Sequence, residues 1–245
     1  MEYRLTTPCT AQDLAPLKAG DTVLLSGVVY TARDQAHKRM IEALDKGEAL
    51  PFDLTGSAIY YVGPTPERPG EVIGSAGPTT SGRMDAMSPR LLDLGNKIMI
   101  GKGKRDAAVK EAVVRNGAVY LAALGGAGAL MAKSVETREV IAWPDLGCEA
   151  VRRLTVQDMP LTVVLDAHGG DLYEEGPAAY LAALGGAGAL MAKSVQTLEV
   201  IAWPDLGCEA VRRLTVRDMP LTVILDAHGG DLYQSGPAAY LESEN

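Results

Sequence analysis

Residues 118–165 read AVYLAALGGAGALMAKSVETREVIAWPDLGCEAVRRLTVQDMPLTVVL, and this stretch indicates the fold class. Ala118–Ala123 is an apolar run of strand length, and the small residues that follow from Gly125 to Lys133 are typical of a helix. Glu139–Trp143 predicts a second buried strand, which the following proline ends.

The second half of this stretch continues the alternation. A short helix is expected over Cys148–Leu154, with Arg152 and Arg153 near its end, where cations interact favourably with the helix dipole. Leu161–Leu165 predicts a third strand, and Asp166 begins the turn that leaves it. Strands that alternate with helices predict an α/β protein built in layers.

Most of this stretch occurs twice in the chain. Residues 121–180 and 181–240 differ at six of 60 aligned positions and are identical at the other 54. Solenoid repeats normally have three or more units with distinct end units, so the pattern favours tandem duplication of a complete segment. The six differing pairs are Glu136/Gln196, Arg138/Leu198, Gln157/Arg217, Val164/Ile224, Glu174/Gln234 and Glu175/Ser235.

Only one of the two copies can occupy a given place in the fold. We expect residues 121–180 to occupy it, although using the second copy instead would add only about 1–2 kcal/mol of loop-closure free energy. The spare copy could pack as an appendage or exchange between protomers, and we expect it to be functionally silent. The expected organisation is a domain over residues 1–180, a second copy over 181–240 and a tail over 241–245.

Composition and charge exclude several classes of protein. The 245 residues include 23 Lys and Arg against 31 Asp and Glu, a net charge of −8 that argues against a nucleic-acid binder. No apolar run reaches the roughly 18 residues that a membrane span needs. Met1–Arg4 carries no apolar signal core, so we expect a cytoplasmic protein. Three scattered cysteines are too few for a disulfide framework or a metal site within this chain.

The amino-terminal half carries the surplus of basic residues. Residues 1–120 hold 15 basic and 14 acidic side chains, whereas residues 121–180 hold 4 and 9, so anion-binding chemistry is expected in the first half. Thr22–Tyr30 predicts a strand broken at Gly27, a helix is expected to begin near Thr31, and Ala58–Val62 predicts another strand.

Residues 73–85, IGSAGPTTSGRMD, form the most unusual segment of the chain. Its glycines would allow the backbone to approach a ligand, and Thr79, Thr80 and Ser81 supply three consecutive hydroxyl groups. Arg83 adds a planar guanidinium suited to a carboxylate, and a helix beginning near Ser81 would offer free amides to an anion. The same composition is also common in simple turns, which is the alternative interpretation.

A lysine between two glycines follows a second apolar run. Lys102 stands between Gly101 and Gly103 at the end of the strand expected near Ile98–Ile100. A flexible cation in this position suits an oxyanion, but it also fits a solvated turn at a strand end.

Several motifs, taken in order, resemble one family. They resemble the β subunit of class I fumarase and L(+)-tartrate dehydratase, a unit that also forms the carboxy-terminal domain of single-chain class I fumarases. The resemblance covers about residues 1–175, and residues 181–240 depart from it because the family normally ends before them. The motifs are TARDQAH at 31–37, YYVGP at 60–64, GPTTSGRMD at 77–85, GKG at 101–103 and DAHGGDLY at 166–173.

The resemblance implies a fold, a cofactor and a partner. The implied fold is the swivelling β/β/α domain of the class I fumarase carboxy terminus. The implied enzyme is a hydro-lyase that reversibly hydrates a C4 dicarboxylate, either fumarate to malate or, in the dehydrating direction, L-tartrate to oxaloacetate. Its [4Fe–4S] cluster would be held by three cysteines of a partner α subunit, so this chain would be the cluster-free half of a hetero-oligomer, inactive alone.

The resemblance also implies residue roles. Thr79 would be the catalytic base, and its alternative role is to cap the following helix. Arg33, Arg83 and Lys102 would bind the substrate carboxylates. The alternatives are a helix-surface ion pair for Arg33, a salt bridge of Arg83 with Asp85, and solvation for Lys102.

Four further residues are candidates for supporting roles: His37, Thr80, Ser81 and Asp85. His37 lies four residues after Arg33 and would share its helical face, where a purely structural histidine is the alternative. A different function class also stays open at this stage. The chain could be a non-catalytic dicarboxylate-binding or scaffold module in which the duplication has impaired catalysis.

Overall fold

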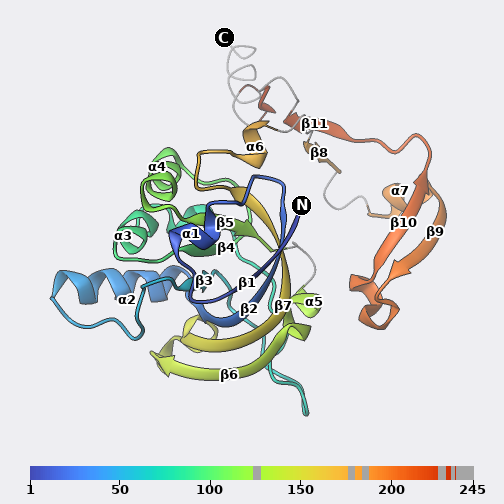
Figure 1. Cartoon of the computed structure of the whole chain (residues 1–245). Helices are drawn as coiled ribbons and strands as arrows, with labels where there is room; N and C mark the ends of the chain where they lie inside the picture. The colour runs from blue at the N-terminus through green and yellow to red at the C-terminus, as the bar shows by residue number, and fades with distance from the viewer. Residues whose placement is uncertain (124–127, 176–179, 184–187, 226–229, 233–234, 236–245) are drawn as a thin grey trace, which may run out of the picture. The chain divides into compact units, whose positions relative to one another are not determined.

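The computed structural model describes residues 1–123, 128–175, 180–183, 188–225, 230–232 and 235. The chain divides into two compact units, Met1–Leu172 and Tyr173–Asn245 (Figure 1). None of the helices in the described residues is long and apolar enough to cross a membrane.

The first unit is organised around strands from both halves of its sequence. Its strands are β1 (Glu2–Thr6), β2 (Thr22–Thr31), β3 (Ala58–Tyr60), β4 (Ile98–Gly101), β5 (Val119–Ala122), β6 (Val135–Ala142) and β7 (Val151–Leu165). Its α-helices are α1 (Ala11–Leu14), α2 (Asp34–Asp45), α3 (Ser88–Asp93), α4 (Ala107–Asn116) and α5 (Gly128–Lys133). Two 3₁₀ helices cover Ser81–Met84 and Pro144–Glu149. Helix α6 (Leu172–Glu175) begins at the last residue of the first unit.

The seven strands form one sheet in the order β1-β2-β3-β4-β5-β7-β6. Each neighbouring pair from β1 to β5 is parallel, whereas β7 runs antiparallel to β5 and β6. The long strand β7 also pairs antiparallel with β2, so the pairings β2-β3-β4-β5-β7-β2 close into a ring. The chain is therefore a mixed α/β protein dominated by its sheet, which confirms the predicted class at that level.

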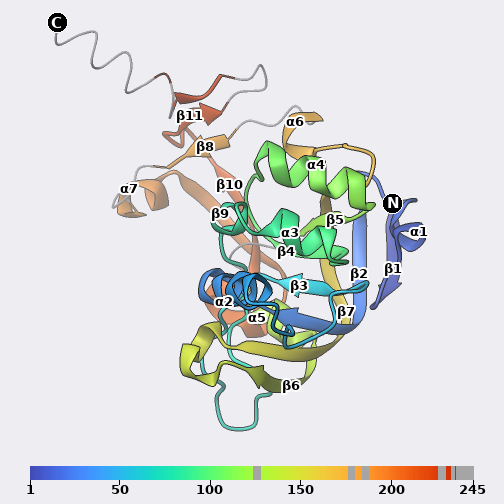
Figure 2. The same cartoon turned by 90° about the vertical axis from the view of Figure 1, so that its left-hand side faces the viewer.

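Two hydrophobic cores lie on the two faces of the central strands. Along β3, Ala58 and Tyr60 belong to one core, whereas Ile59 belongs to the other, as the period of two in a strand requires. Leu91 of α3 and Val109 of α4 pack in the second core. Figures 1 and 2 show α2, α3 and α4 together on that side of the sheet.

The amino-terminal predictions agree with the structure. The run over Thr22–Tyr30 forms β2. The predicted interruption at Gly27 corresponds to a shift in the pairing register with β7, and Gly27 has a positive φ of +98°. A side chain at Gly27 would also be strained by Thr7, whose Oγ1 lies 2.7 Å from where a Cβ would stand. The expected helix begins at Asp34, three residues after the strand ends.

The helix predicted over Cys148–Leu154 is wrong. Pro144–Glu149 is a 3₁₀ helix, and β7 begins at Val151. Tertiary pairing overrides the local pattern, because residues of β7 pair with β2 while Leu154 is fully buried in the core. Arg152 instead donates to the carbonyl oxygens of Gly147, Cys148 and Ala150 at the end of the 3₁₀ helix.

The strand predicted over Glu139–Trp143 exists but is not buried. It is part of β6, which stands at the edge of the sheet, and Val140 is 46% exposed. Of the helix predicted from Gly125, residues up to 127 lie outside the described residues, and α5 covers the remainder to Lys133. An edge strand and a central strand can contain the same kind of apolar stretch, so the sequence did not show that this strand would be exposed.

In the first unit, the first copy supplies β6, β7 and the last two residues of β5, Leu121 and Ala122. The second unit contains the second copy, with β8 (Tyr180–Ala182), α7 (Gly188–Lys193), β9 (Val195–Ala202), a 3₁₀ helix over Pro204–Glu209, β10 (Val211–Val216) and β11 (Thr222–Leu225). β9 pairs with β10 and β8 with β11, the same internal pairings that β6 and β5 make with β7.

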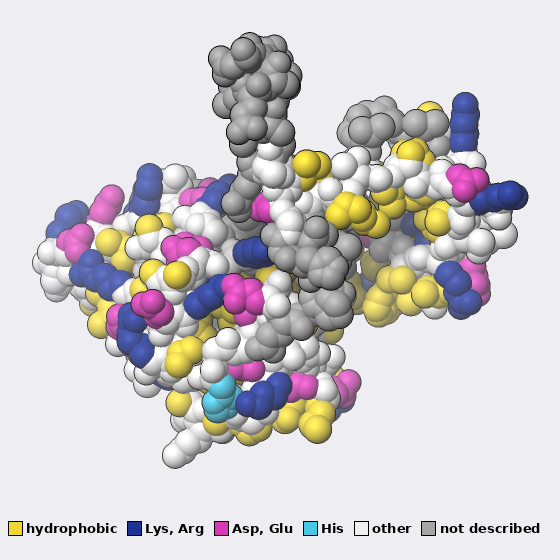
Figure 3. Space-filling view, turned by 90° about the horizontal axis from the view of Figure 1, so that it is seen from above, with side chains coloured by type: hydrophobic (Ala, Val, Ile, Leu, Met, Phe, Trp, Pro, Cys, Tyr) yellow, Lys and Arg dark blue, Asp and Glu magenta, His cyan; other side chains and the backbone are white. Residues whose placement is uncertain are grey.

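Apolar side chains of the second copy are exposed at positions that are buried in the first. Leu154 and Val163 are fully buried, whereas the identical residues Leu214 and Val223 are 45% and 51% exposed. The space-filling view shows hydrophobic side chains gathered over the β9–β10 segment (Figure 3). The second copy thus repeats the pairings within the segment, but among the described residues no further strand pairs with it as β2 and β4 pair with the first.

Candidate functional site

The predicted site lies at the carboxyl ends of the parallel strands β2, β3 and β4. Thr31 of β2 pairs with Tyr60 of β3, and Tyr60 pairs with Ile100 of β4, so the three strands end at one edge of the sheet. Arg33 follows β2 and Lys102 follows β4. Ligand sites in sheets of this kind are found at the carboxyl ends of the strands.

The loop that carries Thr79 is tied to the same edge by backbone hydrogen bonds. The amide of Thr79 donates to the carbonyl oxygen of Tyr61 at 2.8 Å, just beyond β3. Thr80 forms a parallel bridge with Lys102, and the amide of Ser81 donates to the Lys102 carbonyl oxygen at 2.9 Å. The loop therefore brings Thr79 and Thr80 against the segments that follow β3 and β4.

The expected helix does begin at Ser81, but it is short and its first amide is not free for an anion. The segment is a 3₁₀ helix of four residues, Ser81–Met84, and the Ser81 amide is engaged by the Lys102 carbonyl. Thr79 does not cap this helix. Its N-cap is Thr80, whose side chain makes no capping hydrogen bond.

Arg83 contacts two residues of the site. Its Nη2 donates a hydrogen bond to the Thr79 hydroxyl, and its Nε lies 3.2 Å from Oδ1 of Asp34. The alternative in which Arg83 forms a salt bridge with Asp85 is therefore replaced by the pair with Asp34, the first residue of α2.

Arg33 reaches the same carboxylate from the other side. Its Nε lies 3.3 Å from Oδ2 of Asp34, and its Nη2 lies 3.5 Å from Oε1 of Glu149. Glu149 also accepts a hydrogen bond from the Gln35 amide at 2.8 Å. Gly63 permits this approach, because a Cβ at that position would stand 2.9 Å from Nη1 of Arg33.

The structure thus connects three of the four predicted site residues, Arg33, Arg83 and Thr79, with the carboxylate of Asp34 between the two arginines. Arg33, Asp34, Arg83 and Thr79 form a continuous chain of polar contacts. The backbone of Lys102 borders Thr80 and Ser81, while its side chain is exposed and makes no ion pair among the described residues. Its role as a substrate ligand stays a prediction.

Ser81 and Asp85 have structural partners beneath the site. The Ser81 hydroxyl is buried, lies 2.9 Å from the hydroxyl of Tyr120 and accepts the Lys102 amide at 3.1 Å. Asp85 accepts a 2.6 Å hydrogen bond from Nε of Arg105, whose side chain is fully buried.

Aromatic rings enclose the Arg105 guanidinium from two sides. Its central carbon lies 5.3 Å from the ring centre of Tyr61 and 5.0 Å from that of Tyr120, within the range of a cation–π contact. Arg105 also donates to Ser88 at 2.9 Å. These contacts anchor the segment after Lys102 to the residues that follow Arg83, so Asp85 fixes the loop and does not face the arginine pair.

His37 is fully buried one helical turn after Arg33. Its Nδ1 lies 3.2 Å from the Arg33 carbonyl oxygen, and its ring meets Tyr61 edge-on with 5.2 Å between ring centres. Its Nε2 has no hydrogen-bond partner in the described residues. Burial lowers the pKa of His37 from 6.5 to about 4, so the imidazole is neutral near pH 7.

The cysteines do not fit an iron–sulfur cluster. Cys9 is buried, and burial together with the nearby Asp13 carboxylate raises the pKa of its thiol to about 11, which disfavours the thiolate that a metal needs. Cys148 and Cys208 are exposed at equivalent positions of the two copies. Among the described residues, no group of three His, Cys, Asp or Glu side chains could hold a metal ion.

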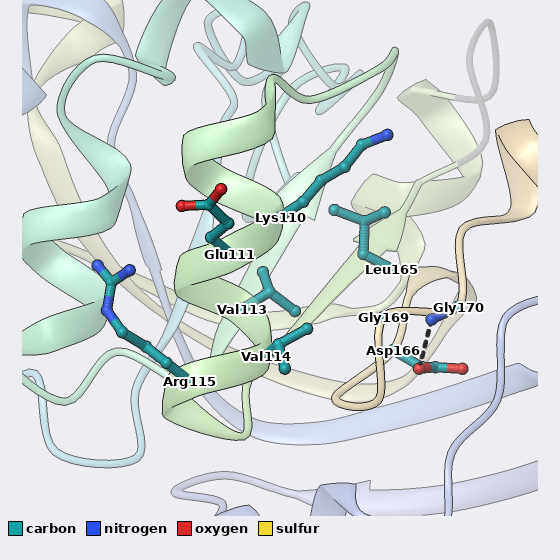
Figure 4. Close-up of a pocket in the computed structure, with 9 residues that line it drawn as sticks. All are labelled: Lys110, Glu111, Val113, Val114, Arg115, Leu165, Asp166, Gly169 and Gly170. Carbon is teal, nitrogen blue, oxygen red and sulfur yellow. Dashed lines mark hydrogen bonds between the residues drawn. The ribbon is translucent and has the colours of Figure 1, made fainter.

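A cavity of about 400 Å³ lies elsewhere in the first unit, between α4 and the turn that follows β7. Figure 4 shows Val113, Val114 and Leu165 along it, with the charged ends of Glu111 and Arg115 directed away from the turn. None of the predicted site residues lines this cavity. Its mostly apolar wall differs from the cationic arrangement predicted for a dicarboxylate site.

Sequence reasoning assigned no role to Asp34 or Glu149. Asp34 lies inside the quoted TARDQAH motif, and its position next to Arg33 was an available signal. Glu149 comes from a segment expected to be helical and more than 110 positions away, so no local pattern connects it with Arg33.

Comparison with known families gives a match over almost the whole chain. The family model described as the fumarase C-terminus matches residues 1–176 and, a second time, residues 174–236. The second match covers most of the second copy, so the same family model matches both copies.

Individual relatives are of two kinds. The chain is 42% identical over 181 residues to the putative L(+)-tartrate dehydratase subunit beta of Methanocaldococcus jannaschii, covering 71% of this chain and 92% of that protein. It is 34% identical over 180 residues to the L(+)-tartrate dehydratase subunit beta of Escherichia coli K12, covering 71% and 88%. It is 39% identical over 170 residues to fumarate hydratase 2 of Leishmania major, covering 67% of this chain but only 29% of that protein.

Proposed function

The chain belongs to the fumarase C-terminus family, and from this premise we propose that it is the β-type subunit of a hydro-lyase acting on a C4 dicarboxylate. The reaction would be the reversible hydration of fumarate to malate or the dehydration of L-tartrate to oxaloacetate. The chain spans most of the tartrate dehydratase β subunits but only 29% of the Leishmania fumarate hydratase. The remaining part of the active site would therefore belong to a partner α subunit.

The observation that carries this proposal is the meeting of Arg33, Arg83 and Thr79 around Asp34 at the carboxyl edge of β2–β4. A dicarboxylate needs two cationic contacts, and guanidinium groups bind carboxylates in a planar, two-pronged geometry. Arg33 and Arg83 would supply these contacts, with Lys102 at the neighbouring strand end as a third cation.

Thr79 would remove the proton from the carbon next to a substrate carboxylate. An unassisted threonine hydroxyl is a very weak base, but the hydrogen bond from the Arg83 guanidinium favours its deprotonated form. The proton would pass on to a carboxylate of the partner subunit. The same guanidinium would stabilise the negative charge that grows on the substrate carboxylate as the proton leaves.

The iron–sulfur cluster implied for this enzyme class would be held by the partner subunit. The cysteines of this chain do not fit the cluster, because Cys9 is buried with a raised thiol pKa and no group of three possible ligands occurs among the described residues. We therefore assign to this chain the binding and orientation of the dicarboxylate and the movement of one proton. The assembly would be a hetero-oligomer.

The test is anaerobic reconstitution of the full chain with a cluster-bearing α subunit, followed by steady-state kinetics with malate and with L-tartrate. We expect Thr79→Val to lower kcat by at least about 100-fold with KM changed little, since a proton transfer is lost while the cations remain. Thr137→Val is the matched control, because that hydroxyl lies on β6 and donates a hydrogen bond to Thr155, away from the proposed site.

Two outcomes would contradict the proposal. Dehydratase activity from this chain alone would refute the division of labour between subunits. Tight binding of malate by the lone chain in calorimetry, together with no activity after reconstitution, would favour the non-catalytic dicarboxylate-binding module instead.

A further inference from the structure

Asp34 stands between the two arginines of the site. It is the first residue of α2, and its side chain is about one quarter exposed. Oδ1 lies 3.2 Å from Nε of Arg83, and Oδ2 lies 3.3 Å from Nε of Arg33. Each oxygen of the Asp34 carboxylate therefore contacts the Nε atom of one of the two arginines.

These contacts involve Nε and Nη2 of each guanidinium but not Nη1, which in Arg33 lies beside Gly63. Arg83 uses Nε for Asp34 and Nη2 for Thr79, while Arg33 uses Nε for Asp34 and Nη2 for Glu149. Within the residues that the structure describes, the Nη1 groups of the two arginines have no acceptor. A ligand carboxylate could bind there without displacing Asp34.

Two guanidinium groups held close together repel each other unless an anion lies between them. A substrate carboxylate would offset this repulsion only after binding, whereas Asp34 offsets it beforehand and fixes both side chains. Through Nε, Asp34 also sets the direction in which Arg83 presents Nη2 to the Thr79 hydroxyl.

We propose that Asp34 is a positioning residue that holds Arg33 and Arg83 side by side and directs their free Nη1 edges toward an incoming dicarboxylate. The contacts themselves can be tested without any assumption about the reaction. The effect on the substrate rests on the proposed function, and a second experiment addresses it separately.

The first experiment measures hydrogen exchange of the arginine Nε protons by NMR in the full chain. In the wild-type chain we expect slow exchange for Arg33 and Arg83, assigned with Arg33→Lys and Arg83→Lys. Asp34→Asn should accelerate both exchanges at least about tenfold, because the charged acceptor is lost. Asp34→Glu keeps the charge and should protect at least one of the two.

Asp45→Asn is the matched control. Asp45 is the last residue of the same helix and pairs with Arg90, so this variant should leave the Arg33 and Arg83 exchange rates unchanged. The proposal is overturned if Asp34→Asn changes both rates less than twofold, or if Asp45→Asn has the same effect as Asp34→Asn.

The second experiment is a double-mutant cycle in the reconstituted enzyme. Asp34→Asn should raise KM for the dicarboxylate about tenfold, but it should change kcat/KM less than threefold when Arg83 is already alanine. A residue that only stabilises the helix would lower thermal stability and give additive effects in the cycle. If the wild-type assembly is inactive, the proposed function fails, while the exchange experiment still decides the role of Asp34.

Discussion

The guanidinium of Arg83 donates a hydrogen bond from Nη2 to the hydroxyl of Thr79, four residues earlier in the chain, while its Nε contacts Asp34. One side chain thus links the hydroxyl proposed as a base to the carboxylate at the start of α2. This double use requires a planar group with several donors in fixed directions, which a lysine ammonium lacks.

Arg83→Lys should therefore be a severe change although the charge is kept. We expect kcat/KM for the dicarboxylate to fall at least about 100-fold, because a single ammonium cannot hold Asp34, Thr79 and the substrate together. Arg115→Lys is the control, since Arg115 forms a comparable two-bond pair with Asp93 on the surface. A loss of less than threefold for Arg83→Lys would remove this residue from the site.

His37 should make the stability of the fold depend on pH. Burial lowers its pKa from 6.5 to about 4 in the folded chain, so the unfolded chain binds the proton more tightly between these values. The contribution is fully present above about pH 6.5 and is lost as pH falls toward 4. The pKa difference corresponds to roughly 3 kcal/mol.

The measurement is urea unfolding of wild-type and His37→Phe chains between pH 4 and 7.5. We expect the free energy of unfolding of the wild-type chain to fall with decreasing pH more steeply than that of the variant. Phenylalanine keeps the edge contact with Tyr61 but carries no titrating group. Parallel curves for the two proteins would show that His37 does not titrate as its burial requires.

The buried pair of Asp85 and Arg105 should dominate the stability of the site loop. Arg105 is fully buried and Asp85 is 10% exposed at the side chain, so Asp85→Ala leaves an uncompensated charge in the interior. We expect a loss of about 3–5 kcal/mol in denaturant unfolding. Asp93→Ala, which breaks the exposed pair with Arg115, should cost less than about 1 kcal/mol. Equal losses from the two variants would contradict this difference.

The parts of the fold that follow from local pattern could be predicted from sequence. The apolar run over Ala58–Val62 and the helix after Thr31 are local signals, and the motif of residues 77–85 indicated where polar chemistry gathers. The convergence of Arg33 and Arg83 could not be derived from spacing alone. It depends on parallel pairing of β2, β3 and β4, which brings their carboxyl ends to one edge.

Other features depend on contacts that no local pattern contains. Val151–Leu154 has a helical appearance, but pairing with β2 makes it a strand. Leu214 is 45% exposed although the identical Leu154 of the first copy is fully buried, so the same local sequence does not fix the burial of a side chain. The contacts of Asp34 could not be predicted from sequence for the same reason, because Arg33 and Arg83 come together only in the folded sheet.

The two copies offer a matched pair of substitutions for the last prediction. Val163 in β7 is fully buried, whereas Val223, at the same position of the second copy, is 51% exposed. In the full chain, Val163→Asp should destabilise the first unit by several kcal/mol, because it places a charge in the core. Val223→Asp should change stability by no more than about 0.5 kcal/mol.

Amide exchange in β2 is the appropriate readout, because β2 pairs with β7 and so reports whether the sheet is complete. We expect Val163→Asp to accelerate exchange at Val29 both in the full chain and in a chain lacking residues 181–240. The truncated wild-type chain should keep the protection of the full chain, because β5, β6 and β7 all lie in residues that the truncation keeps. If Val163→Asp were tolerated in the full chain and damaging only after truncation, the second copy would be filling the place in the sheet that we assign to the first.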